Sequence, residues 1–111
     1  MSVSVIIPVY NQAKYIGDAI DSILIQTKKA NEIIVVNDGS TDELLDVLRE
    51  YRMVITLINL ERNQGVSFAR NTGIKHATGD IIIFQDADDI AMPKRIAYSI
   101  NVLLNKNAFI A

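Results

Sequence analysis

The sequence contains no cysteine, so disulfide bonds and thiolate metal sites are excluded. It also lacks long hydrophobic runs, since its apolar stretches are far shorter than the roughly 20 residues that span a bilayer. The N-terminus has neither the basic start nor the cleavage site of a signal peptide. With a net charge of −2, the sequence indicates no basic surface for nucleic acid. We therefore expect a cytoplasmic domain without a nucleic-acid partner, associated with membranes only through segments outside this sequence.

What the sequence does contain is a regular alternation of strand and helix patterns. β-Branched apolar runs predict strands at 3–9, 32–37, 54–60 and 81–85. Amphipathic or capped stretches predict helices at 13–26, about 40–51, 65–77 and about 93–105. Ser40 with Glu43 fits a capping box at the start of the second helix. The alternation predicts one α/β domain over residues 1–111, a Rossmann-like three-layer α/β/α fold with a mainly parallel sheet.

The sequence ends in Ala108-Phe109-Ile110-Ala111, which looks like the opening of a fifth strand. A buried strand without its continuation would leave backbone groups unpaired. We therefore expect a fragment of a longer chain, in which the sheet is truncated after about four strands.

Polar clusters follow three of the predicted strands. In open parallel sheets, ligands bind beyond the carboxyl ends of the strands, and these clusters fall at that edge. We therefore predict one site built from all three. The clusters are Pro8-Val9-Tyr10-Asn11, Asn37-Asp38-Gly39-Ser40 and Asp86-Ala87-Asp88-Asp89.

The aspartate cluster after the fourth strand carries the strongest chemical signal. Residues of an extended segment alternate faces, so Asp86 and Asp88 can point the same way while Ala87 points elsewhere. Neighbouring carboxylates repel each other unless a cation joins them, and oxygen ligands suit Mg²⁺ or Mn²⁺. The alternative is a polar turn that caps the fourth helix, with Asp89 near its N-terminus. Three acidic residues directly after an apolar strand favour the metal site.

Two further residues have open roles. Asp38 could accept a hydrogen bond from a nucleotide base or a ribose hydroxyl, or it could serve as a turn residue before Gly39. Arg70 could reach diphosphate oxygens with its planar guanidinium, or brace one of the aspartates. A dinucleotide-binding fold is not indicated, because Tyr10-Asn11-Gln12-Ala13 follows the first strand and contains no glycine.

Several motifs in order along the chain resemble glycosyltransferase family 2. The resemblance is collinear over nearly the whole sequence, which makes it far more specific than any single motif. The matching segments are Val5-Ile6-Ile7-Pro8-Val9-Tyr10-Asn11, Val36-Asn37-Asp38-Gly39-Ser40-Thr41-Asp42, Asn63-Gln64-Gly65, Ala69-Arg70-Asn71, Gly73, Gly79-Asp80, Asp86-Ala87-Asp88-Asp89 and Pro93.

That resemblance implies a GT-A fold, a nucleoside-diphosphate-sugar donor with uracil as the common base, and Mn²⁺ or Mg²⁺ as cofactor. It implies that Pro8, Tyr10 and Asp38 hold the base, with Val9 and Asn11 in the same segment. Asp86 and Asp88 match the DxD motif, with Asp86 and Ala87 toward the ribose. Asp88 would bind the metal, Asp89 would share or support that role, and Arg70 would brace the aspartates or the diphosphate.

The resemblance also implies transfer of the sugar with inversion to a saccharide, lipid-linked or protein acceptor, as in polysaccharide biosynthesis. Inversion requires a carboxylate that deprotonates the acceptor hydroxyl. In the family this base lies in the second half of the domain, so we expect it beyond Ala111 and expect the isolated fragment to be inactive. The alternative is a non-catalytic nucleotide-binding or interaction module, which loss of one DxD carboxylate would favour; both Asp86 and Asp88 are present.

Overall fold

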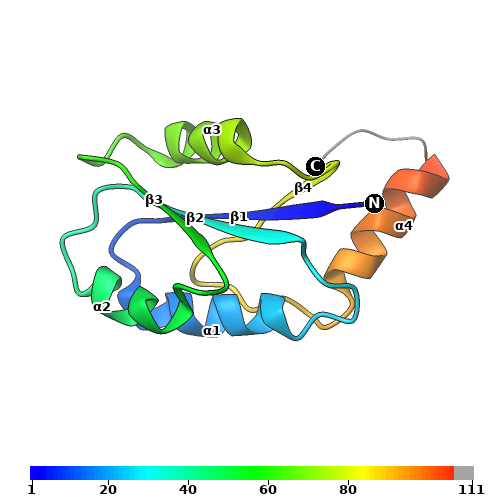
Figure 1. The fold of residues 1–111 in the computed structure, drawn as a ribbon, viewed down its shortest axis with the longest axis horizontal. Helices are drawn as coiled ribbons and strands as arrows, with labels where there is room; N and C mark the ends of the chain where they lie inside the picture. Colours follow the sequence, from blue (N-terminus) through cyan, green and yellow to red (C-terminus); the bar gives the residue numbers. More distant parts are fainter. Residues whose placement is uncertain (107–111) are drawn as a thin grey trace.

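The computed structural model describes residues 1–106, which fold as alternating strands and helices (Figure 1). The elements in order are β1 (Val3–Val9), α1 (Ala13–Leu24), β2 (Glu32–Asn37), α2 (Leu44–Leu48), the 3-10 helix η1 (Arg49–Tyr51), β3 (Thr56–Asn59), α3 (Val66–His76), β4 (Ile81–Phe84) and α4 (Arg95–Lys106). Every predicted strand and helix within this range is confirmed in type. The fifth strand predicted at 108–111 lies outside the described residues.

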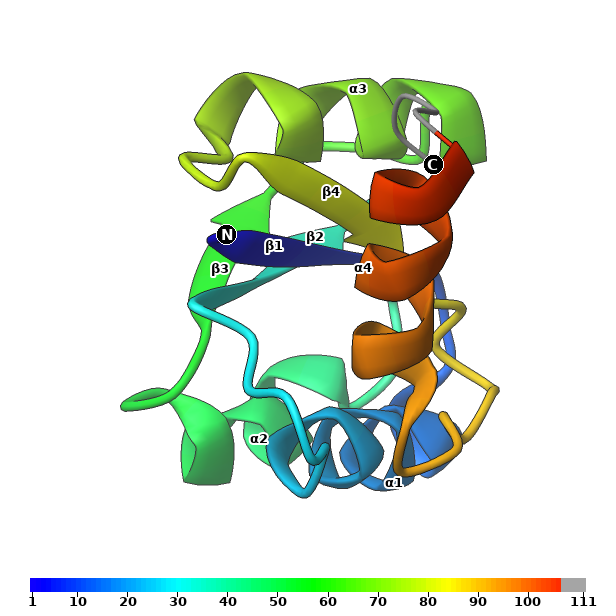
Figure 2. The ribbon, with the colours of Figure 1, turned by 90° about the vertical axis from the view of Figure 1, so that its right-hand side faces the viewer.

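The four strands form one parallel sheet in the order β3-β2-β1-β4. Figure 1 shows α3 on one face of this sheet and α1 and α2 on the other, which confirms the three-layer α/β/α prediction. Figure 2 shows α4 rising beside the sheet from the layer of α1 toward the layer of α3. None of the helices within residues 1–106 is long and apolar enough to cross a bilayer.

Strand β1 is central and is buried on both faces, as its continuous apolar run predicts. Its odd-numbered residues, such as Val5 and Ile7, pack with Ile16 and Ile20 of α1 in the larger core cluster. Ile6 points to the opposite face and packs with Ala69 of α3. Alternation of side chains along the strand thus divides the core into two layers.

Helix α3 lies close against β1, which brings its polar residues to the carboxyl edge of the sheet. A Cβ atom built on Gly73 would approach Cγ2 of Ile6 to 2.5 Å, so a larger residue would push the helix away. Arg70, three residues earlier on α3, is thereby held near the end of β4. The close packing of Gly73 on Ile6 therefore helps to position Arg70 beside the site.

Helix α2 begins later than predicted, and the capping box of Ser40 with Glu43 is wrong. Glu43 occupies the N-cap, and its own side chain makes no capping hydrogen bond. Ser40 Oγ instead accepts a hydrogen bond from the backbone N–H of Asn11 at 3.0 Å. Asp42 accepts from the N–H of Leu44 with one oxygen and from the N–H of Ala13 with the other. One aspartate therefore satisfies donors at the starts of both α2 and α1.

Strand β3 is also shorter than predicted, because the residues before it belong to a turn. The N–H groups of Val54 and Ile55 both donate to the carbonyl of Tyr51, at 2.9 and 3.1 Å. Ile55 packs against the larger core cluster and Val54 is 46% exposed, and neither residue belongs to the sheet ladder. The observed strand therefore begins at Thr56.

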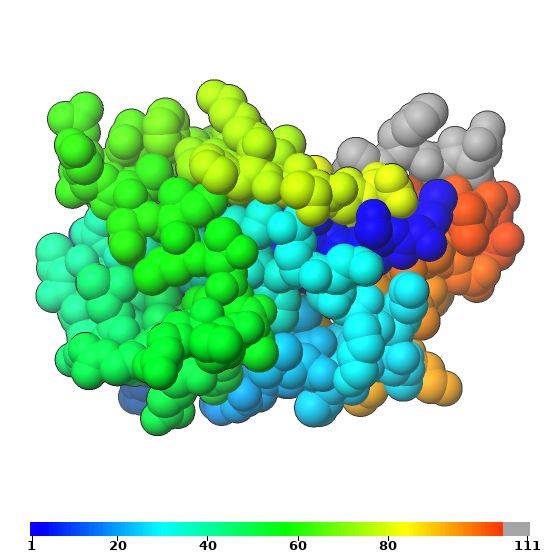
Figure 3. Space-filling view, in the orientation of Figure 1, coloured from blue at the N-terminus to red at the C-terminus, as the bar shows by residue number. Residues whose placement is uncertain are grey.

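At the opposite, amino edge of the sheet, polar side chains from three segments form hydrogen bonds with one another. Figure 3 shows these segments side by side at the surface. Glu32 accepts hydrogen bonds from Ser4 Oγ at 2.5 Å and from the N–H and Oγ1 of Thr78 at 2.6 and 2.9 Å. Burial acts to raise the pKa of the Glu32 carboxyl, but these hydrogen bonds together lower it below its ordinary value. This carboxylate therefore has a structural role far from the carboxyl edge.

Candidate functional site

A pocket of about 380 Å³ opens at the carboxyl edge of the sheet, where the site was predicted. Three strand ends and the start of α3 build its wall. The residues that line it are Pro8, Val9, Tyr10, Gln12, Asp38, Asn63, Gly65, Val66, Asp86, Ala87 and Asp88. Of the residues predicted for the site, seven line this pocket. Asn11, Arg70 and Asp89 lie next to it and make the contacts described below.

The turn after β1 is joined to the turn after β2 by Asn11. Its backbone has a positive φ of 51°, a conformation that asparagine tolerates better than most residues. Asn11 Oδ1 accepts a hydrogen bond from the N–H of Thr41 at 2.7 Å, and the N–H of Asn11 donates to Ser40 Oγ. The side-chain oxygen of Asn11 thus fixes the pocket wall. Tyr10, directly before it, is left 45% exposed at the pocket.

Asp38 is buried and holds the loop that precedes α3. Its Oδ1 accepts a hydrogen bond from the N–H of Gln64 at 2.8 Å, and its Oδ2 accepts from the N–H of Gly65 at 3.0 Å. Asn63 Nδ2 also donates to Oδ2, at 3.1 Å. The sequence predicted either a nucleotide contact or a turn role for Asp38. The observed partners instead lie about 25 residues further along the chain. Asp38 therefore shapes the pocket through the loop at 63–65.

Gly39 allows the same loop to pass directly over the end of β2. Its φ is +73°, and a Cβ atom there would lie 2.4 Å from the backbone carbon of Arg62 and the backbone nitrogen of Asn63. Because the obstacle is backbone and not a flexible side chain, no other residue fits without moving the loop. The contact between two backbones brings Asn63 into the pocket.

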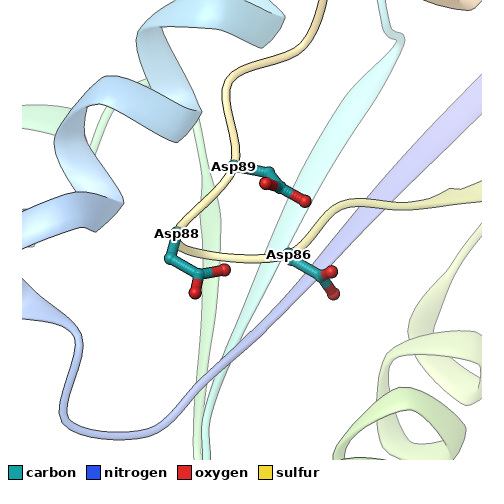
Figure 4. A group of neighbouring side chains, drawn as sticks. All are labelled: Asp86, Asp88 and Asp89. Atoms are coloured by element: carbon teal, nitrogen blue, oxygen red, sulfur yellow. The ribbon is translucent and has the colours of Figure 1, made fainter.

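The three aspartates after β4 form one carboxylate cluster (Figure 4). One oxygen from each of Asp86, Asp88 and Asp89 lies within 4.8 Å of the others, and all three residues are exposed. The N–H of Asp89 donates to the carbonyl of Asp86 at 3.1 Å, which closes the turn that presents them. An exposed group of carboxylate oxygens at this spacing fits a hard divalent cation that retains several waters, such as Mg²⁺ or Mn²⁺.

Arg70 lies beside this cluster. Its Nη2 is 3.6 Å from Asp86 Oδ1, and its guanidinium lies 5.3 Å from the centroid of the Phe84 ring. Its Nε is buried and has no hydrogen-bond partner among the residues that the structure describes. The ion pair matches the bracing role that the sequence left open. The cation–π contact with Phe84 gives the guanidinium a second partner beside the cluster.

Several residues that build the site have no role predicted from the sequence. Gln12, Asn63, Gly65 and Val66 line the pocket. A signal for Asn63 was available, because Asn63-Gln64-Gly65 is one of the motifs in the resemblance. Gln85 was interpreted only as the end of a strand, although its side chain is 1% exposed and contacts the aspartate turn.

Known proteins provide independent comparisons with this arrangement. The family model described as Glycosyl transferase family 2 matches residues 4–111. An uncharacterized glycosyltransferase of Rickettsia prowazekii is 46% identical over 101 residues, covering 91% of this chain and 31% of that protein. The chain therefore spans about a third of the length of this relative.

Solved structures of glycosyltransferases are also similar to this chain. S. aureus TarS 1–349 in complex with UDP-GlcNAc has a TM-score of 0.84 and 32% identity over 96% of this chain and 32% of its own. The mannosyltransferase PcManGT from Pyrobaculum calidifontis, in complex with GDP-Man and Mn²⁺, has a TM-score of 0.84 and 31% identity over 91% of this chain and 32% of its own. These neighbours are glycosyltransferases with a GT-A fold, and the fold of this chain is of that type.

Proposed function

This chain belongs to glycosyl transferase family 2, and from that premise we propose that residues 1–111 form the nucleotide-diphospho-sugar-binding part of a glycosyltransferase. The donor is a UDP-sugar, the sugar passes to an acceptor hydroxyl with inversion, and Mn²⁺ or Mg²⁺ assists. The observation that carries this proposal is the aspartate cluster at the mouth of the pocket that Pro8, Tyr10 and Asp38 also line. A base pocket and a diphosphate site are thereby adjacent.

The base and ribose would occupy the part of the pocket between β1 and β2. Tyr10 offers an exposed ring for stacking, and Pro8 and Val9 offer apolar contacts. Each carboxylate oxygen of Asp38 has more than one acceptor lone pair, so Asp38 can hold the loop at 63–65 and also accept from a base N–H. Asn11 contributes by fixing the turn that carries Tyr10. The complex of TarS with UDP-GlcNAc supports a uridine nucleotide as the donor.

The diphosphate would lie against the aspartate turn. Asp86, Asp88 and Asp89 would hold the divalent cation, and Ala87 between them would contact the ribose side of the nucleotide. A bound divalent cation stabilises the negative charge that develops on a leaving diphosphate. Arg70, paired with Asp86, would orient that carboxylate and place a second positive charge near the phosphates. The Mn²⁺ in the PcManGT complex supports a metal at this kind of site.

Inversion requires a base on the acceptor side, opposite the leaving diphosphate. We assign no residue of the described range, 1–106, to that role. The chain by itself is therefore proposed to bind the donor and to need an acceptor-binding part for transfer. Binding of the nucleotide is accordingly the property to test on this chain.

Calorimetric titration of UDP into the chain tests the proposal, first with Mn²⁺, then with EDTA, and again on Asp88→Ala. We expect binding with Mn²⁺ that weakens strongly both in EDTA and in Asp88→Ala. Asp46→Ala is the matched control, since Asp46 is an exposed aspartate of α2 that does not line the pocket. Equal UDP binding by the wild type and Asp88→Ala, from folded proteins, would contradict the metal-assisted donor site. GDP in place of UDP tests the choice of base.

A further inference from the structure

Gln85 is a buried amide directly before the aspartate turn. Only 1% of its surface is exposed, and its N–H donates to the carbonyl of Ile6 at 2.9 Å, one position beyond the last residue of β4. The backbone of Gln85 therefore still follows the sheet. A long polar side chain at such a position requires partners for both ends of its amide.

The amide nitrogen of Gln85 closes the aspartate turn from the inside. Nε2 donates to the carbonyl of Asp89 at 2.8 Å and to the carbonyl of Asp86 at 3.3 Å. These are the first and last residues of the carboxylate cluster, and Asp86 O also accepts the N–H of Asp89. The side chain of Gln85 thus connects both ends of the turn to the sheet. The spacing of the carboxylates depends on the distance between these two carbonyls.

The orientation of this amide is determined by Arg95 at the start of α4. Arg95 Nη1 donates to Gln85 Oε1 at 2.6 Å, and Arg95 Nη2 donates to the carbonyl of Phe84 at 2.9 Å. A guanidinium has donors only, so the oxygen of Gln85 must face Arg95 and its nitrogen must face the turn. The forked contact therefore locks both the side chain and the strand end that precedes the aspartates.

We propose that Gln85, locked by Arg95, is the positioning residue that holds Asp86, Asp88 and Asp89 at the separation a divalent cation needs. The inference rests on the proposed metal site and assigns two residues to it that do not touch the cation. Loss of the Gln85 amide releases the two carbonyls of the turn, so the carboxylates no longer share one preformed arrangement. Partners of this kind affect metal affinity by roughly 10- to 100-fold.

Gln26 provides a matched control. It is also a fully buried glutamine, with Nε2 donating to the carbonyls of Ser22 and Met92 and Oε1 accepting from the N–H of Ile96. Gln85→Met and Gln26→Met therefore remove the same number of hydrogen bonds from equally buried amides. Only the first change removes contacts to the aspartate turn itself, whereas Gln26 holds the start of α4.

The experiment measures the affinity of Mn²⁺ alone for the folded chain, from the EPR signal of free Mn²⁺, with thermal unfolding recorded for every variant. We expect Gln85→Met to weaken binding by roughly tenfold or more, and Gln26→Met to keep the wild-type affinity at a similar loss of melting temperature. Equal affinities for Gln85→Met and the wild type would overturn the inference while leaving the metal site intact. A wild-type affinity that does not depend on Asp88 would overturn both.

If Gln85→Met does not fold, Arg95→Met tests the same positioning role of Gln85. Arg95 is only half-buried, and its removal takes a positive charge away from the neighbourhood of the cation. Electrostatics alone would then tighten Mn²⁺ binding, whereas loss of the lock on Gln85 would weaken it, by roughly threefold to tenfold. Weaker binding supports positioning, and unchanged or tighter binding overturns it.

Discussion

Replacement of Asp38 by alanine should destabilise the chain, because the Asp38 carboxylate holds the loop at 63–65. The substitution removes the acceptor for two backbone N–H groups, of Gln64 and Gly65, and for Asn63 Nδ2. Asp38 is 3% exposed, so these hydrogen bonds are shielded from water in the folded chain. The loop at 63–65 would lose its attachment to the end of β2.

The magnitude follows from the three contacts. A hydrogen bond to a charged group contributes roughly 1.5–3 kcal/mol, which gives an upper limit of about 4.5–9 kcal/mol for three. The donors lie beside an open pocket, so water re-solvates part of them, and we expect a loss of about 2–4 kcal/mol. At roughly 4 °C per kcal/mol for a domain of this size, the melting temperature should fall by about 8–16 °C.

Urea unfolding followed by circular dichroism measures this loss. Asp46→Ala is the control, because Asp46 is 72% exposed and forms only an i,i+3 ion pair with Arg49 at 3.3 Å. Such a pair contributes at most about 0.5 kcal/mol. If Asp38→Ala lost less than about 1 kcal/mol, the loop would not depend on Asp38, and our account of the pocket wall would be refuted.

Three further predictions concern backbone and pH. Gly39→Ala should cost about 2–4 kcal/mol, because its φ is +73° and its Cβ would meet backbone at 2.4 Å. Gly65→Ala, with φ +97°, ψ 159° and open space, should cost about 1–3 kcal/mol from backbone strain alone; urea midpoints compare the two. Burial first, and then the Asp21 carboxylate, raises the pKa of Tyr51 to about 12 from 10.0, so stability present below pH 10 should be lost as pH rises toward 12. Tyr51→Phe should lack this loss in alkaline melting curves, and an equally steep decline would contradict the assignment. The lowered pKa of Glu32 implies stability that is present above pH 4.5 and lost as pH falls below it; acid unfolding of Glu32→Gln should show a smaller decline.

The sequence alone determined the type and order of the elements and the edge at which the candidate site lies. Continuous apolar runs such as 3–9 mark strands buried on both faces, and helical spacing such as Ile16, Ile20 and Ile23 marks the covering helices. Parallel connections bring the carboxyl ends of β1, β2 and β4 to one edge, so residues that follow them must meet. The aspartate cluster could be predicted because its members are neighbours in the chain.

Only the tertiary structure decided how the loops at that edge are held. Asp42 satisfies one donor of α1 that lies 29 residues away, Asp38 reaches the loop at 63–65, and Arg95 locks Gln85 from another element. No local sequence pattern predicts these hydrogen-bond partners, because each polar side chain also has possible partners close by in the chain. The capping box predicted for Ser40 and Glu43, which does not form, is an example. Which donor meets which acceptor depends on the separation between backbone segments. That separation is set only when the sheet and its helices pack together.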